Sequence, residues 1–180
     1  MFKSLLTLKS FSSNEEEFFK NSSTQPTQNQ IKVQQKSLLI GNKIPKNFFL
    51  TSGIGESDIT IHAGSYHLAL KDAGIERCNI VTYSSILSSI ATEIQKPTEA
   101  EIIHGSVMET IMACANSNQG EIATAGLIIG WLFDKETNEK FGGLVCEYSG
   151  NDEEEKAFQT LRESLDELYK NGFGFLLECY

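Results

Sequence analysis

The stretch from Cys78 to Leu87 constrains the fold more than any other part of the chain. Its β-branched residues and Tyr83 predict a buried strand. Strands usually end in a turn, whereas this one runs into two adjacent hydroxyls, Ser84 and Ser85, and then into further apolar residues. The fold must therefore hold a serine pair at the end of a rigid strand.

The serine pair has one unusual chemical option. The hydroxyl of Ser85 can attack the carbonyl of Ser84 and convert the peptide bond into an ester. Elimination and hydrolysis would then split the chain and leave a ketone, a pyruvoyl group, at the new amino terminus. We hypothesise that Ser85 becomes this ketone and that the protein decarboxylates an amino acid with it. The pair alone fits ordinary hydroxyls at a strand end better, because serine pairs recur at positions 12–13, 22–23 and 88–89.

Charge and cysteine usage exclude several classes of function. The 180 residues carry a formal net charge of -9, which argues against binding to nucleic acid or to an anionic membrane surface. The apolar run 123–133 is too short to span a bilayer, so we expect no membrane insertion. The four cysteines and three histidines are scattered. We therefore expect free thiols in a reducing compartment, the cytoplasm, and no metal site.

The chain divides into a tail and one domain. Residues 12–36 are rich in Ser, Thr, Asn and Gln and lack a sustained apolar period, so we expect residues 1–44 to form a disordered polar tail. Residues 45–180 form the expected domain. It begins with a strand over 47–51, and the tight loop that follows presents the carboxylates of Glu56 and Asp58.

The remaining elements alternate in a way that indicates fold class. The last helix has the clearest helical spacing of apolar residues. The order of elements predicts an α+β fold, with sheets that carry helices on their outer faces. A helix is expected over 61–73, the key strand over 78–87, further strands within 102–113, 121–133 and 141–148, a helix over 152–170 and a final strand over 172–179.

Glu147 is the second residue that could carry chemistry. It stands in the apolar run Gly-Gly-Leu-Val-Cys-Glu-Tyr, where a carboxylate is costly to bury unless it is paired or protonated. Partial burial would raise its pKa, which suits a proton donor near neutral pH. Strand alternation also fits a Glu147 on a solvated sheet face. A serine hydrolase is disfavoured, since Ser106 is not in a nucleophile elbow. A pairing of His104 with Glu109 is a further possibility.

Taken together, these pieces resemble the pyruvoyl-dependent arginine decarboxylases, from about Ile44 to the C-terminus. Their order and spacing are far more specific than the serine pair alone. The motifs are Leu50-Thr51-Ser52-Gly53 with Glu56, Ala73-Gly74-Ile75, Asn79-x4-Ser84-Ser85-Ile86, and Gly143-Leu144-Val145-Cys146-Glu147-Tyr148-x-Gly150.

The resemblance implies self-cleavage between Ser84 and Ser85, which gives a β chain of residues 1–84 and an α chain of residues 85–180. The pyruvoyl group, derived from Ser85, is then the covalent cofactor. Asn79 matches the asparagine that assists self-processing, through a hydrogen bond to the attacked carbonyl. Glu147 matches the proton donor in decarboxylation. The family folds as an αββα sandwich and forms trimers with active sites between subunits. A homotrimer of αβ units or a dimer of trimers is therefore implied.

The implied reaction takes a small amino-acid substrate, L-arginine, through a Schiff base on the pyruvoyl group to agmatine and CO2. The purpose would be polyamine supply or acid resistance. One departure concerns the substrate: His67 stands where family members commonly carry an aspartate facing the guanidinium, and imidazole is a poor guanidinium partner. Glu56 or Asp58 is then expected to supply the charge. The alternatives are the same chemistry on another amino acid such as aspartate, or a non-cleaving, non-catalytic trimeric homologue.

Overall fold

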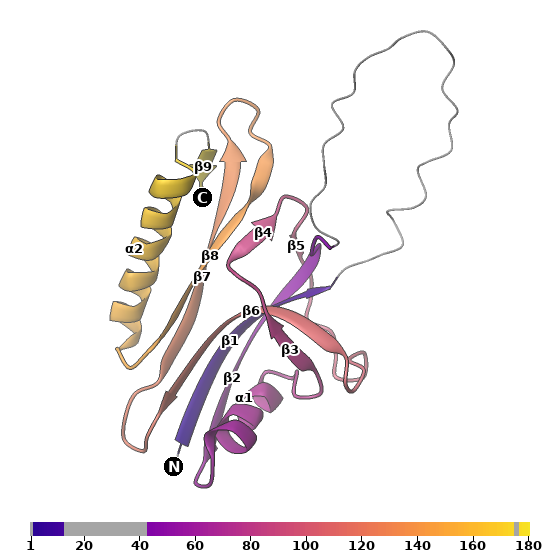
Figure 1. Cartoon of the computed structure of the whole chain (residues 1–180), viewed down its shortest axis with the longest axis vertical. Helices are drawn as coiled ribbons and strands as arrows, with labels where there is room; N and C mark the ends of the chain where they lie inside the picture. The colour runs from indigo at the N-terminus through magenta and orange to yellow at the C-terminus, as the bar shows by residue number, and fades with distance from the viewer. Residues whose placement is uncertain (1, 13–42, 175–176) are drawn as a thin grey trace, which may run out of the picture.

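The computed structural model describes residues 2–12, 43–174 and 177–180, and over 2–12 the backbone alone. Its strands form a first sheet in the order β3-β6-β1-β2-β5 and a second sheet in the order β4-β8-β7-β9 (Figure 1). The elements are β1 (Phe2–Ser12), β2 (Asn47–Ser57), the π-helix η2 (Ile61–Tyr66), α1 (His67–Asp72), β3 (Asn79–Thr82), β4 (Ile86–Ser88), β5 (Thr92–Glu93), β6 (Val107–Ser117), β7 (Thr124–Asp134), β8 (Lys140–Gly150), α2 (Glu154–Gly172) and β9 (Leu177–Cys179).

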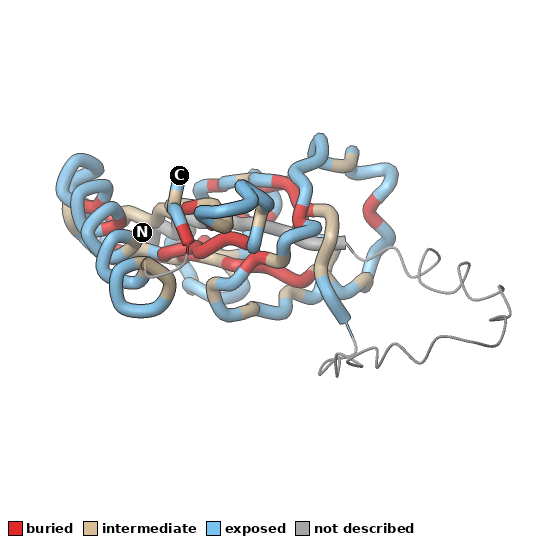
Figure 2. The backbone as a smooth tube through the Cα atoms, turned by 90° about the horizontal axis from the view of Figure 1, so that it is seen from above, coloured by how far each residue is buried: buried red, intermediate tan, exposed pale blue. Residues whose placement is uncertain are grey.

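Three apolar clusters arrange these elements in layers. Between the sheets, Phe48 of β2 and Ile111 of β6 pack in one cluster with Leu87 of β4 and Val145 of β8. A second cluster joins α1 to the outer face of the first sheet, and a third joins α2 to the outer face of the second sheet. In Figure 2 the buried segments lie toward the middle of the molecule, while most of α2 is exposed. The order helix, sheet, sheet, helix confirms the expected α+β class.

Strand β2 takes the place of the loop that we expected around Glu56 and Asp58. It continues through Glu56 and ends one residue before Asp58. Its glycines allow the helical segment to pack closely on the strand: a Cβ added to Gly53 would lie 2.1 Å from the carbonyl oxygen of Ala69, and Gly55 is equally confined. The glycines therefore serve helix–sheet contact, and the expectation of a loop is wrong.

Strand β1 corrects the expected disordered tail. Residues 2–12 lie inside the first sheet, paired antiparallel with β2 on one edge and with β6 on the other. Main-chain hydrogen bonds along both edges hold such a strand. These bonds do not depend on side chains, so the amino-acid composition does not predict them. The rest of the expected tail, residues 13–42, lies outside the described residues.

Strand β3 is shorter and more exposed than the buried strand expected over 78–87. It spans four residues at the edge of the first sheet, and three of the four are exposed. By contrast, the helix expected over 152–170 is confirmed as α2, with both ends two residues later. In the described part of the chain, no helix has the length and apolar character needed to cross a membrane.

Candidate active site

The serine pair lies where the chain crosses from one sheet to the other. We call residues 83–85 the crossover, because they link β3 of the first sheet to β4 of the second (Figure 1). On one side, the N–H of Tyr83 donates to the carbonyl of Thr110 on β6 at 2.7 Å. On the other side, the carbonyl of Ser85 accepts from the N–H of Val145 on β8 at 2.9 Å. Ser84 is thus the single residue between two anchored neighbours.

The hydroxyl of Ser85 meets the carboxylate predicted from the sequence. Its Oγ donates to Oε1 of Glu147 at 2.6 Å, across 62 positions of the chain. Strand alternation puts Glu147 on the same face of β8 as Val145, but nearer to solvent, and Glu147 is exposed. Of the two arrangements considered from the sequence, the structure therefore has the solvated sheet face and not the partial burial. The carboxylate nevertheless lies where it can accept the proton of the Ser85 hydroxyl.

The carbonyl of Ser84 also has a partner in the backbone. It accepts a hydrogen bond from the N–H of Ile86 at 2.8 Å. A bond between residues two apart closes a γ-turn, here centred on Ser85. An N–H aimed at a carbonyl that undergoes attack stabilises the negative charge that develops on the oxygen. The turn therefore presents the Ser84 carbonyl already polarised.

Asn79 does not reach this carbonyl within one chain. Its side-chain amide donates to the carbonyl of Gly105 at 2.9 Å, and its main-chain N–H donates to the carbonyl of Ser106 at 2.8 Å. Asn79 is the first residue of β3. Five residues of extended chain, at roughly 3.3 Å each, separate it from Ser84. In one chain the Ser84 carbonyl accepts a hydrogen bond from the Ile86 N–H, whereas the Asn79 amide is bound to Gly105.

The expected substrate-binding residues lie far from the crossover in the same chain. Lys3 of β1 pairs with Glu56 on one side and with Ser117 of β6 on the other, so Glu56 is level with Ser117 in the sheet. Ser117 is seven residues along β6 from Thr110, which binds Tyr83. Seven residues of strand span about 23 Å. His67 begins α1 on the outer face of the first sheet, whereas alternation along β2 turns Glu56 to the inner face. Asp58 follows β2, and all three expected residues, Glu56, Asp58 and His67, are exposed. One chain does not bring them to Ser85.

Next to the serine pair, the structure shows a polar cluster that the sequence did not reveal. Oε1 of Glu109 accepts a hydrogen bond from the hydroxyl of Tyr83 at 2.5 Å. The same oxygen forms an ion pair with Nζ of Lys43 at 2.8 Å. We call Lys43, Tyr83 and Glu109 the inter-sheet cluster. The pairing of Glu109 with His104 considered from the sequence is wrong, since Glu109 binds these two residues and His104 is exposed. The position of Tyr83 next to the serine pair was the one sequence signal.

Electrostatics favour the observed charges of the inter-sheet cluster. The hydrogen bond to Glu109, with burial and the charge of Glu109, raises the pKa of Tyr83 to about 12, so the phenol keeps its proton. Burial raises the pKa of Glu109, but the hydrogen bonds from Lys43 and Tyr83 and the charge of Lys43 outweigh it and hold the pKa below the ordinary value. Glu109 is therefore a carboxylate at neutral pH.

A metal site is not evident in the part of the chain that the structure describes, where no three His, Cys, Asp or Glu side chains gather in a suitable arrangement. Two packed sheets, with a serine pair at their crossover and a carboxylate on the second serine, match the self-processing pyruvoyl class that the resemblance implied. A family model described as pyruvoyl-dependent arginine decarboxylase matches residues 47–180. The chain belongs to this family.

Individual relatives agree with the family match. A pyruvoyl-dependent arginine decarboxylase of Methanocella arvoryzae is 34% identical over 115 residues, which cover 63% of this chain and 68% of the relative. That of Methanopyrus kandleri is 32% identical over 125 residues, 69% of this chain and 75% of the relative. The pyruvoyl-dependent arginine decarboxylase AaxB of Chlamydia caviae is 38% identical over 119 residues, 60% of each chain.

Proposed function

We propose that this chain cleaves itself between Ser84 and Ser85 and then converts L-arginine to agmatine and CO2. The observation that carries the proposal is the 2.6 Å hydrogen bond from Ser85 Oγ to Glu147 Oε1, next to a Ser84 carbonyl that already accepts the Ile86 N–H. The family supplies the substrate class, since the relatives are named for arginine.

Self-cleavage begins with an acyl shift. Ser85 Oγ attacks the carbonyl carbon of Ser84, and its proton passes to Glu147. The Ile86 N–H stabilises the negative charge on the carbonyl oxygen. The bond between the Ser84 carbonyl carbon and the Ser85 nitrogen then breaks, and the nitrogen takes up a proton. An ester now joins Ser84 to the side chain of Ser85.

The ester is resolved by elimination. A base removes the α-proton of Ser85, the Cβ–Oγ bond breaks, and the carboxylate of Ser84 leaves as the end of the β chain. The α chain then begins with a dehydroalanine, whose amine tautomerises to an imine. Water converts the imine to the ketone and releases ammonia. The products are residues 1–84 and residues 85–180, with the pyruvoyl group at position 85.

The residues present fit the pyruvoyl group, because the precursor serine has both a proton acceptor and a polarised neighbouring carbonyl. The group supplies an electrophilic carbonyl that withdraws electrons from the α-carbon of the substrate. Glu147 remains beside position 85 and returns a proton to that α-carbon after CO2 leaves. From the sequence, Glu147 was assigned to decarboxylation alone. The geometry supports a second role for it in cleavage.

The proposal includes a trimer of αβ units, or a dimer of such trimers. Glu56, Asp58 and His67 are exposed and far from Ser85 in one chain, so a neighbouring subunit is needed for them to meet the site. The side chain of Ile86, directly after the crossover, is apolar and 60% exposed, which suits such an interface. The four free cysteines support the cytoplasm as location.

Intact-mass measurement of the purified protein tests cleavage. We expect two fragments, residues 1–84 and residues 85–180. The mass of the second should correspond to a chain that begins with a pyruvoyl group in place of Ser85. One unbroken chain would instead support the non-catalytic homologue. A panel of amino acids, assayed for CO2 release, tests the substrate. His67 in place of an acidic residue keeps aspartate as the second candidate, and release from aspartate but not from arginine would overturn the assignment.

A further inference from the structure

The inter-sheet cluster includes Tyr83, the residue directly before the serine pair. The proposed chemistry does not use this cluster. The side chain of Glu109 is 12% exposed and that of Lys43 is 42% exposed. A largely buried carboxylate is unfavourable unless it is paired and hydrogen-bonded. Glu109 is satisfied by both Lys43 and Tyr83. In some proteins, buried charges of this kind fix one local arrangement, so the question is which part of the chain this cluster holds.

The cluster holds Tyr83 on the first sheet at both ends. The main-chain N–H of Tyr83 donates to the Thr110 carbonyl. Its ring packs against the apolar cluster between the sheets, which includes Phe48 and Leu87. Its hydroxyl donates to Glu109. Backbone, ring and hydroxyl together fix the direction in which the chain enters Ser84.

The reacting atoms lie between this anchor and a second one. Ser85 is held on the second sheet by the Val145 N–H and by Glu147. Only Ser84, an exposed residue, joins the two anchors. The attack requires Ser85 Oγ to approach the Ser84 carbonyl carbon along one direction. That geometry depends on both anchors, because release of either side lets the peptide rotate.

We propose that Tyr83, held by Glu109 and Lys43, is a positioning residue for self-cleavage. It keeps the Ser84 carbonyl within reach of the Ser85 hydroxyl. This inference rests on the proposed function, since it concerns the step that creates the electrophile. Tyr83 acts through the backbone of Ser84 and takes no part in proton transfer.

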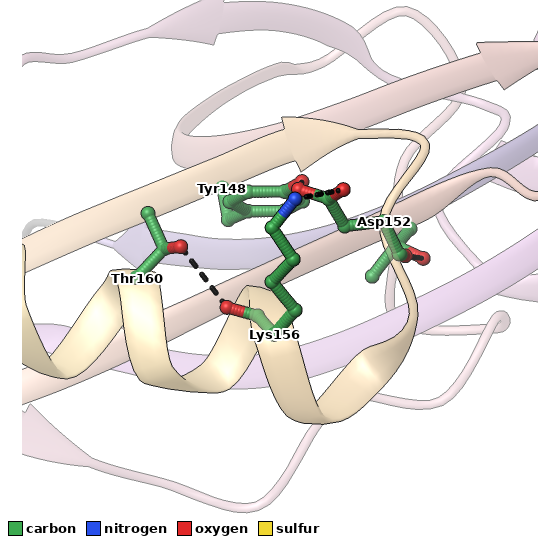
Figure 3. A network of polar contacts seen from close by, with 5 residues as sticks. Tyr148, Asp152, Lys156 and Thr160 are labelled. Carbon is green, nitrogen blue, oxygen red and sulfur yellow. Dashed lines mark hydrogen bonds and ion pairs between the residues drawn. The ribbon is translucent and has the colours of Figure 1, made fainter.

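A second cluster of the same composition provides a matched control. Asp152 Oδ2 accepts the hydroxyl of Tyr148 at 2.6 Å, and Asp152 Oδ1 accepts Lys156 Nζ at 2.7 Å (Figure 3). We call Tyr148, Asp152 and Lys156 the helix-start cluster. It lies at the beginning of α2, on the outer side of the second sheet. Asp152 and Lys156 do not contact the crossover.

The experiment follows cleavage of the full chain during cell-free synthesis, with samples denatured at intervals and separated on a gel. We expect Tyr83→Phe and Glu109→Gln to slow the appearance of the fragments by roughly tenfold or more. Lys43→Met should slow cleavage less, and Lys43→Arg, which keeps the positive charge, should cleave at the wild-type rate. Asp152→Asn and Lys156→Met should cleave within about twofold of wild type. Melting temperatures are measured for every variant.

The outcomes separate this inference from the function beneath it. If the wild-type chain never cleaves, the proposed function fails first. If wild type cleaves, and folded Tyr83→Phe keeps its rate, the positioning role is refuted while the proposed function stands. Equal slowing of a control variant with the same loss of melting temperature would also refute it, because the effect would then be general destabilisation. Glu109→Gln can fail to fold, and Tyr83→Phe, which removes a single hydroxyl, then decides.

Discussion

The inter-sheet cluster and the helix-start cluster contain the same three groups, a tyrosine hydroxyl and a lysine on one carboxylate. They differ in depth and in sequence separation. The carboxylate side chain of Glu109 is 12% exposed, whereas that of Asp152 is 36% exposed. Lys43 and Glu109 are 66 positions apart, whereas Lys156 and Asp152 are one helical turn apart. The first cluster joins segments far apart in the sequence, and the second lies at the start of one helix.

This difference shows why like groups have unlike consequences. At the helix start, solvent screens the ion pair, and such i,i+4 pairs contribute little to stability. Between the sheets, the same groups replace lost hydration and restrict the chain beside the serine pair. Position relative to Ser84 and Ser85, and not composition, therefore decides which cluster matters for function.

The largest effect is expected where neither cluster can compensate. Ser85→Ala removes the nucleophile, so the chain should remain whole and CO2 release should be lost, although both clusters are intact. Ser89→Ala, in the neighbouring serine pair, is the control and should cleave normally. A gel and an intact mass provide the measurement. Two fragments from Ser85→Ala would show that the electrophile arises elsewhere.

The next effect concerns the carboxylate on the reacting hydroxyl. Glu147→Gln should reduce CO2 release per cleaved chain by about 100-fold or more, because general acid–base groups typically contribute factors of this size. It should also slow cleavage, since the Ser85 hydroxyl loses its proton acceptor. Glu139→Gln, in the turn before β8, is the control. Full activity of Glu147→Gln would show that another group donates the proton.

The third effect, a difference between the two clusters in the free energy of unfolding, is smaller. Tyr83→Phe removes a hydrogen bond to a charged, largely buried partner and should lower the free energy of unfolding by about 1–2 kcal/mol. Tyr148→Phe removes a bond to a more exposed carboxylate and should have a smaller effect. Urea unfolding of cleavage-blocked chains, each carrying Ser85→Ala, compares the two. Equal losses would contradict the difference in burial.

The smallest expected effect is the loss of stability at alkaline pH, when Tyr83 ionises. The pKa of Tyr83 is raised to about 12, so the folded state favours the protonated phenol. Its contribution to stability is therefore complete below pH about 10 and lost as the pH rises toward 12. Tyrosinate absorbance of the Ser85→Ala chain, minus that of the same chain with Tyr83→Phe, isolates this titration. A Tyr83 that ionises at an ordinary pKa would show that Glu109 does not hold its hydroxyl.

Much of the local structure could be predicted from residue patterns. Helix α2 follows from its apolar spacing, and the ion pair of Lys156 with Asp152 from two residues four positions apart. The contact between Ser85 and Glu147 was anticipated only through the order of family motifs. The inter-sheet cluster, by contrast, had no local pattern, because Lys43 and Glu109 meet only when β2 and β6 enter one sheet.

The sequence by itself therefore determined the α+β class, the family, and the choice of the serine and the carboxylate that the structure brings into contact, because spacing and motif order are properties of the linear chain. Only the tertiary structure decided that residues 2–12 join the first sheet, that Asn79 binds Gly105, and that Tyr83, directly before the serine pair, is held by Glu109. These outcomes depend on strand register and on contacts between segments far apart in sequence. Such contacts form only when the sheets assemble.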